Sequence, residues 1–319
     1  MIARFAIVFF FVMVLIVVPV LLSLPLRIFF PWKTCRRAAI AIAVVIWGIV
    51  GYGTFIGFGK MQVRHITFSS KDLPASFDGY RVLQFSDAHV GTMTGRWKWL
   101  MARAVDSIMA QKADMIVFTG DIQNLSPREL TEHMAQLKRL NARDGVFSVL
   151  GNHDYAIYQR ADSLTKLKAV RLTQRMERQA GWNLLMNEHK IVRRDSDSIV
   201  VAGMENWGAS ERMPRIGDVS QTLRGVDSTA FILMLQHDPT AWRKKILPLS
   251  HAQLTLSGHT HGGQMTIFGW SPVQIIYDEW GGMTYDGQRA IHVSTGLGGL
   301  IPFRFGLPGE IVVVTLRKE

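Results

Sequence analysis

The sequence predicts one large α/β domain over residues 61–319, preceded by a two-helix transmembrane hairpin over residues 1–60. Two long uncharged apolar stretches near the N-terminus indicate the hairpin. After residue 60, short apolar runs alternate with amphipathic stretches, which is typical of strands joined by crossover helices. Five of those apolar runs end in Asp, Asn or His residues, so the sheet is expected to carry a functional site at one edge.

The two apolar stretches run from Phe5 to Leu26 and from Ala38 to Gly59, and each lies between basic residues. As a helix, each would be roughly 33 Å long, enough to cross the core of a bilayer. A cleaved signal peptide is the alternative for the first stretch, but its apolar run is too long and it lacks a small-residue cleavage site. Gly53 and Gly57 have a GxxxG spacing that would let the two helices approach closely.

Two spans place the N-terminus and the large domain on the same side of the membrane. The basic residues are evenly divided between the two sides: Arg27, Lys33, Arg36 and Arg37 in the connecting loop, and Arg4, Lys60, Arg64 and Lys71 on the other side. The higher charge density of the short loop favours a cytoplasmic loop. The expected location is therefore a bacterial cytoplasmic membrane, with the domain facing outward.

Charge and cysteine content restrict the function only coarsely. The formal charge of +11 suits an anionic partner such as phosphate, phospholipid headgroups or nucleic acid. Cys35 is the only cysteine and lies in the predicted hairpin, so the large domain can form no internal disulfide. No linker or internal repeat divides residues 61–319, which favours one domain.

The domain is expected to alternate strands with helices. The predicted strands lie within residues 80–87, 114–121, 145–155, 198–205, 229–239 and 252–261. Apolar residues at helical spacing predict helices around 97–108 and 130–137, and a third helix is expected between Tyr155 and Gly181.

The polar residues at the strand ends have the side chains of a metal site. They are Asp87 and His89 in "SDAHVG", Asp121 in "TGDIQN", Asn152 and His153 in "GNHDY", His237 in "QHDP", and His259 and His261 in "SGHTHGG". Any one of these motifs could be a turn, a helix cap or a surface loop. Because all five follow strands, a shared site is the better interpretation. Oxygen and imidazole ligands without thiolate suit Mn, Fe, Zn or Ni.

The ordered series D-x-H, G-D, G-N-H-D, H and G-H-x-H, from Asp87 to His261, resembles the calcineurin-like metallophosphoesterases. The resemblance implies an α/β/β/α sandwich. The later segment "STGLGGLIPFRFGLPGEIVVVTL" resembles the C-terminus of a membrane-associated branch that includes bacterial phosphodiesterases and UDP-2,3-diacylglucosamine pyrophosphatases.

The resemblance also implies a role for each residue and two divalent metal ions as cofactors. Asp87, His89 and His261 would hold one metal, Asn152, His237 and His259 the second, and Asp121 would bridge them. A hydroxide formed between two such cations is the expected nucleophile. His153 matches the family's catalytic histidine, which acts as a general acid or steadies the charge on phosphorus.

One position departs from the family pattern. Many relatives orient the catalytic histidine with an acidic residue three positions after the bridging aspartate, where this chain has Asn124. Either Asp154 takes over this role, or the imidazolium is less stabilised. Alternatively, Asp154 is a loop residue that caps the following helix.

The resemblance and the hairpin together predict a membrane-tethered phosphohydrolase that cleaves a phosphodiester or pyrophosphate. Its partners would be the bilayer and an anionic, lipid-linked or envelope substrate such as UDP-2,3-diacylglucosamine, from lipid A biosynthesis; no protein partner is inferred. A nuclease would also suit the basic charge, but the hairpin counts against it. A catalytically silent lipid-binding module is the other alternative, and the intact site residues count against that.

Trp270 and Tyr277 are expected to pack in the core or to receive an acyl chain or nucleobase.

Overall fold

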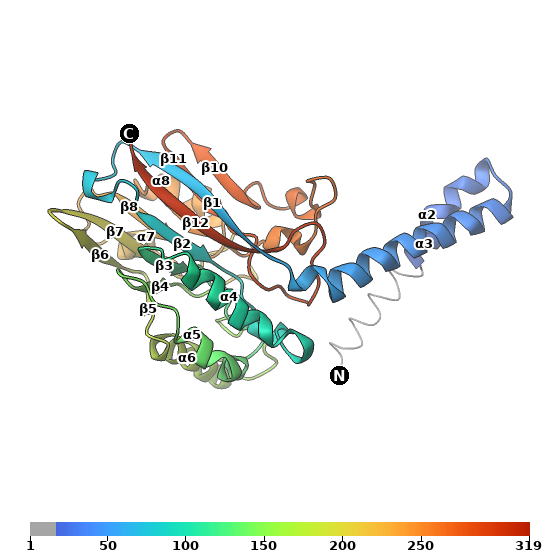
Figure 1. The fold of residues 1–319 in the computed structure, drawn as a ribbon, viewed down its shortest axis with the longest axis horizontal. Coiled ribbons are helices and arrows are strands. Elements are labelled where there is room, and N and C mark those ends of the chain that lie inside the picture. The colour runs from blue at the N-terminus through green and yellow to red at the C-terminus, as the bar shows by residue number, and fades with distance from the viewer. Residues whose placement is uncertain (1–16) are drawn as a thin grey trace.

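The computed structural model describes residues 17–319, and its centre is a pair of six-stranded sheets (Figure 1). The first sheet has the order β1-β12-β2-β3-β4-β5. Its strands are β1 (Met61–Ser70), β2 (Arg81–Phe85), β3 (Met115–Phe118), β4 (Val146–Ser148), β5 (Asn183–Leu184) and β12 (Gly309–Lys318). Strands β2 to β5 are parallel, and β12 is antiparallel to β2.

The second sheet has the order β10-β11-β9-β8-β7-β6. Its strands are β6 (Glu188–Arg194), β7 (Asp197–Gly203), β8 (Ile232–Leu235), β9 (Leu254–Ser257), β10 (Gly282–Asp286) and β11 (Arg289–Val293). Strands β7, β8, β9 and β11 are parallel, while β6 and β10 form antiparallel edges.

The central strands are buried on both faces, which explains their continuous apolar sequences. In β3, Met115 and Val117 belong to the core between the sheets, whereas Ile116 and Phe118 belong to the core on the other side. In β8, Leu233 and Leu235 face the inter-sheet core, whereas Ile232 and Met234 face a third core. This period of two is that of a strand, so the two sheets pack face to face with an apolar layer outside each.

Helices cover the outer faces. On the first sheet they are α4 (Trp99–Ala110), α5 (Met134–Leu137) and α6 (Ser163–Gln179) (Figure 1), and the second sheet carries α7 (Val219–Thr222), a π-helical turn at Trp242–Ile246 and α8 (Leu247–Leu249). The α/β/β/α sandwich is therefore confirmed. The helix expected around 130–137 is mostly a 3-10 helix, Pro127–His133, which continues into the single turn of α5.

An apolar helix precedes the domain. Helix α3 (Trp32–Phe55) projects from one end of the sandwich, and the short α2 (Val18–Ser23) lies beside it (Figure 1). The helical segment from Trp32 to Gly59 contains an 18-residue stretch with a mean hydropathy of 2.2 and is long enough to cross a membrane. Most of the first predicted span, Phe5–Leu26, lies outside the described residues.

Gly53 and Gly57 lie against the large domain. A methyl group added at Gly53 would overlap the Phe303 ring, and one at Gly57 would overlap the main-chain oxygen of Arg304. The Arg304 N–H also donates to the oxygen of Gly53 at 3.1 Å. The small residues therefore let α3 dock against the domain, while most of the helix expected beside them lies outside the described residues.

Candidate metal centre

The two sheets end at a common edge, where all eight polar residues singled out in the sequence come together. Strands β2, β3 and β4 supply residues from the first sheet, and β8 and β9 supply residues from the second. Seven of the eight are buried and His259 is nearly so: Asp87, His89, Asp121, Asn152, His153, His237, His259 and His261. A buried group of this composition points to a common ligand.

Asp87, His89 and His261 form the first donor group. One ligand atom from each lies within 4.8 Å of the others. His261 Nε2 is 3.5 Å from Asp87 Oδ1, and the rings of His89 and His261 have centroids 4.8 Å apart. The three side chains thus converge on one small volume.

Asn152, His237 and His259 form the second donor group. Asn152 Oδ1 is 2.8 Å from His259 Nδ1 and 3.1 Å from His237 Nε2. Asp121 lies between the two groups, because its Oδ2 is 3.2 Å from His237 Nε2 and 3.6 Å from His89 Nε2. A carboxylate in this position has the geometry of a bridge.

The backbone is strained at these positions. Five of the residues have left-handed φ angles, between 40° and 74°: Asp87, His89, Asp121, His259 and His261. Such conformations cost about 1–3 kcal/mol each in non-glycine residues and are tolerated where function needs them. At Gly258 an added Cβ would overlap the Asp87 carboxylate and the Ser86 hydroxyl, so the close approach of the two sheets requires glycine there.

Neighbouring groups orient the donor atoms. His237 Nδ1 lies 2.7 Å from the Thr119 carbonyl oxygen, which can only accept, so Nδ1 carries a proton and Nε2 is the nitrogen that faces the centre. His259 Nε2 contacts the Tyr277 hydroxyl at 3.0 Å, leaving Nδ1 for the centre. The Asn152 amide nitrogen donates to the Tyr158 hydroxyl at 3.0 Å, which turns its oxygen inward.

The charges at the centre favour a bound cation. Burial acts to lower the pKa of His237, but the Asp121 carboxylate outweighs it and raises that pKa to about 10, so this buried position stabilises positive charge. Burial lowers the pKa of His89 to about 3, so its imidazole is neutral, and neither ring nitrogen has a hydrogen-bond partner among the described residues. Burial raises the pKa of Asp87 to about 6. Burial also acts to raise the pKa of Asp121, but the neighbouring His237 imidazole outweighs it and holds that pKa well below its usual range. Orphaned imidazole nitrogens beside buried carboxylates suit divalent metal ions.

His153 is oriented by the main chain of Asn124. His153 Nδ1 lies 2.6 Å from the carbonyl oxygen of Asn124, so the side chain that replaces the family's acid is not the contacting group. Asp154 does not take over that role either. Its carboxylate accepts the main-chain N–H groups of Asp121, Ile122, Gln123 and Gly151, and so fixes the loops that carry the donors.

Glu129 is a positioning residue that the sequence analysis missed. Its carboxylate accepts the N–H of Asn124 at 2.7 Å and those of Leu125 and Ser126 at 3.0 and 3.2 Å. It therefore holds the Asn124 peptide whose oxygen faces His153. The signal in the sequence is the capping box Ser126-x-x-Glu129, with Pro127 at the first helical position.

We expect Glu129→Gln to lower kcat about tenfold with little change in KM, because glutamine offers one acceptor oxygen in place of two and loosens the Asn124 peptide. Steady-state hydrolysis of a chromogenic diester measures this. Glu132→Gln is the matched control, since Glu132 is exposed on the same 3-10 helix and forms a surface ion pair with Lys98. An unchanged kcat in Glu129→Gln would contradict the positioning role.

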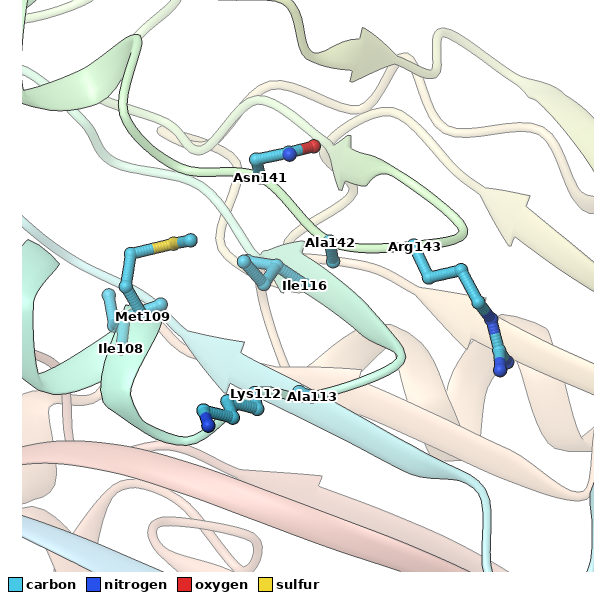
Figure 2. A pocket seen from close by; sticks show the side chains of 8 residues that line it. All are labelled: Ile108, Met109, Lys112, Ala113, Ile116, Asn141, Ala142 and Arg143. Atoms are coloured by element: carbon cyan, nitrogen blue, oxygen red, sulfur yellow. The ribbon is translucent and has the colours of Figure 1, made fainter.

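A separate hollow of about 450 Å³ lies near the C-terminal end of α4 (Figure 2). None of the residues that line it is a His, Asp or Glu: they are Ile108, Met109, Lys112, Ala113, Ile116, Asn141, Ala142 and Arg143. It lies at the opposite ends of the strands from the donor groups, so it is not part of the metal centre.

Comparison with known proteins agrees with this geometry. The model of the calcineurin-like phosphoesterase family matches residues 80–263. The chain is 30% identical to the uncharacterized metallophosphoesterase YkuE of Bacillus subtilis over 88% of this chain and 94% of that protein. It is 28% identical to a transmembrane protein with metallophosphoesterase domain from Danio rerio, over 87% of this chain and 62% of that one.

Among solved structures, a dimetal phosphatase from Danio rerio matches with 14% identity and a TM-score of 0.43, over 70% of this chain and 89% of that one. The family match extends from the residue before β2 to just beyond His261, so it includes every donor described above. This chain belongs to the calcineurin-like phosphoesterase family and is a metallophosphoesterase.

Proposed function

We propose that the chain is a membrane-tethered, binuclear metallophosphoesterase, with residues 1–60 as the anchor and residues 61–319 as the catalytic domain. The observation that carries the proposal is the Asp121 carboxylate, which contacts both donor groups. Asp87, His89 and His261 would hold one divalent cation, and Asn152, His237 and His259 the other. When bound, such a pair supplies Lewis-acid catalysis of the attack of water on a phosphate ester.

His153 would protonate the leaving oxygen. Since the Asn124 carbonyl occupies Nδ1, the Nε2 nitrogen is the one free to exchange a proton with the substrate. The main-chain N–H of His153 donates to Asp121 Oδ1 at 2.8 Å, which ties the acid to the bridging carboxylate. The Asp121 carboxylate thus positions both the cations and the proton donor.

The substrate we propose is a phosphodiester or pyrophosphate attached to a lipid, such as UDP-2,3-diacylglucosamine. Support comes from α3, which leaves the domain at the end that carries the donor groups, and from the membrane-named relatives. A net charge of +11 favours an anionic substrate and an anionic bilayer surface. The bilayer would be the bacterial cytoplasmic membrane, with the domain on its outer side.

The test uses the full chain in detergent, loaded separately with Mn²⁺, Fe²⁺, Zn²⁺ or Ni²⁺. Each form is assayed on bis-p-nitrophenyl phosphate, UDP-2,3-diacylglucosamine, and single-stranded DNA and RNA. We expect hydrolysis of the chromogenic diester and of the lipid-linked pyrophosphate. Preferential cleavage of nucleic acid would replace the proposal with a nuclease, and no hydrolysis with any metal would favour a silent lipid-binding module.

A further inference from the structure

The segment between β9 and β10 carries an unusual apolar surface. We infer that residues Ile267–Ile276, here called the apolar loop, insert into the headgroup region of the phospholipid bilayer beside α3. The inference rests on the membrane tether of the proposed function and assigns to the lipid surface a second contact, made by the catalytic domain itself.

The exposed side chains of the apolar loop are large and uncharged. Phe268 is completely exposed, Ile275 is 78% exposed and Ile276 is 75% exposed. No Lys, Arg, Asp or Glu occurs from Met265 to Tyr277. Single exposed apolar residues are ordinary, but several from one short segment indicate a surface that meets an apolar partner.

The loop holds these side chains in a fixed conformation. Ile267 and Trp270 exchange two main-chain hydrogen bonds of 2.9 and 3.0 Å, which close a two-residue turn at Phe268 and Gly269. Both turn residues have positive φ angles, 52° and 81°, as in a type I′ turn. Phenylalanine gains nothing locally from this left-handed position, so its place at the tip favours a role outside the domain.

The base of the loop is connected to α3. Thr266 N–H donates to the Phe305 oxygen at 2.8 Å. The Phe305 ring packs edge-on against Tyr52 of α3, with centroids 5.8 Å apart. Figure 1 shows the orange segment before β10 at the end of the domain from which α3 projects. A helix crossing the bilayer would therefore bring the apolar loop to its surface.

The surroundings of the α3 end match a membrane–water interface. Arg96 stacks on the rings of Phe55 and Trp97, and Lys60 lies over the ring of Tyr52. Trp99, beside them, is 43% exposed. Tryptophan, tyrosine and basic side chains are enriched at lipid headgroups. We therefore propose that the apolar loop contacts a bilayer rather than a protein.

The loop also leads into the metal centre. Tyr277 follows Ile276 directly, and its hydroxyl contacts His259 Nε2 at 3.0 Å. Insertion of the loop would bring Tyr277, and with it the metal centre, towards the lipid surface. A lipid-linked phosphate could then reach the donor groups while its acyl chains stay in the bilayer.

Depth-dependent fluorescence quenching tests the inference. Cys35→Ser in the full chain removes the native thiol, and Phe268→Cys is labelled with an environment-sensitive dye in phosphatidylcholine–phosphatidylglycerol vesicles. Spin-labelled lipid with its probe near the headgroup is expected to quench this dye about twofold or more. The same dye at Ser196→Cys, in the β6–β7 turn at the opposite end of the domain, should not be quenched.

A third label separates this inference from the tether. Val44 lies in the middle of α3 and is 65% exposed, so a dye at Val44→Cys should be quenched by lipid with a deep acyl-chain probe if α3 crosses the bilayer. Quenching at 44 without quenching at 268 would overturn the inference alone, and no quenching at 44 would overturn the tether. Cross-linking between two copies through residue 268, without quenching there, would assign the loop to self-association. The diester assay on the same samples reports the enzyme activity independently.

Discussion

Asp121→Asn is expected to reduce hydrolysis of a chromogenic diester on the order of a thousandfold or more and to lower the bound metal content. The substitution keeps the size of the side chain but removes the negative charge between the two donor groups. Loss of an interaction worth several kcal/mol of transition-state stabilisation corresponds to a rate effect of this size. Metal content is measured by mass spectrometry on the purified full chain, and activity by product absorbance.

The fold should survive this change. Asp121 has a left-handed φ of 61°, a conformation that asparagine also tolerates, and the asparagine oxygen can still accept the His153 N–H. Asp195→Asn is the matched control, because Asp195 also has a left-handed φ, 53°, but is exposed in the β6–β7 turn. If Asp121→Asn kept the activity and the metal content of the parent protein, the proposed bridging role of Asp121 would be wrong.

The donor residues could be predicted from the sequence because each of them follows a buried strand of a largely parallel sheet. A buried strand is a short apolar run, and its carboxyl end is followed by the residues that meet at the sheet edge. Asp87, Asp121 and His259 were therefore expected at one location, and they lie together there although up to 172 positions separate them. The left-handed φ angles of these residues could not be predicted from any local sequence pattern.

Contacts between a loop and a distant element were not predictable in the same way. The GxxxG spacing of Gly53 and Gly57 predicts close approach but does not name the partner, and the partner is the Phe303–Arg304 segment. Asn124 suggested a weakened contact with His153, because a sequence shows side chains and not the main-chain oxygen that makes the contact. Strands β1, β5, β6, β10, β11 and β12 were not predicted. In the β10–β11 hairpin each strand has only five residues, so the alternation of Met283 with Tyr285 and of Ile291 with Val293 is too short to be a clear pattern.

Arg304→Lys is expected to lower the free energy of unfolding by about 3 kcal/mol or more. The Arg304 guanidinium is completely buried and donates to three main-chain oxygens at 2.8 Å, those of Thr295, Gly296 and Gly298. A lysine amine has three donors on one atom and cannot reach acceptors spread around a planar fork. Each buried carbonyl left without a partner costs about 1–3 kcal/mol. Urea unfolding of the full chain in detergent, followed by tryptophan fluorescence, measures the change.

Arg317→Lys is the control for this substitution, because its side chain is 53% exposed and pairs with Asp78 at 3.3 Å; the expected change is within about 0.5 kcal/mol. Arg304→Lys should also reduce metal content, since the Gly298 N–H donates to the Asp87 main-chain oxygen at 2.9 Å. Burial lowers the pKa of Arg304 to about 10, so the guanidinium remains charged at neutral pH. Parental stability in Arg304→Lys would mean that the carbonyls of Thr295, Gly296 and Gly298 do not depend on the guanidinium.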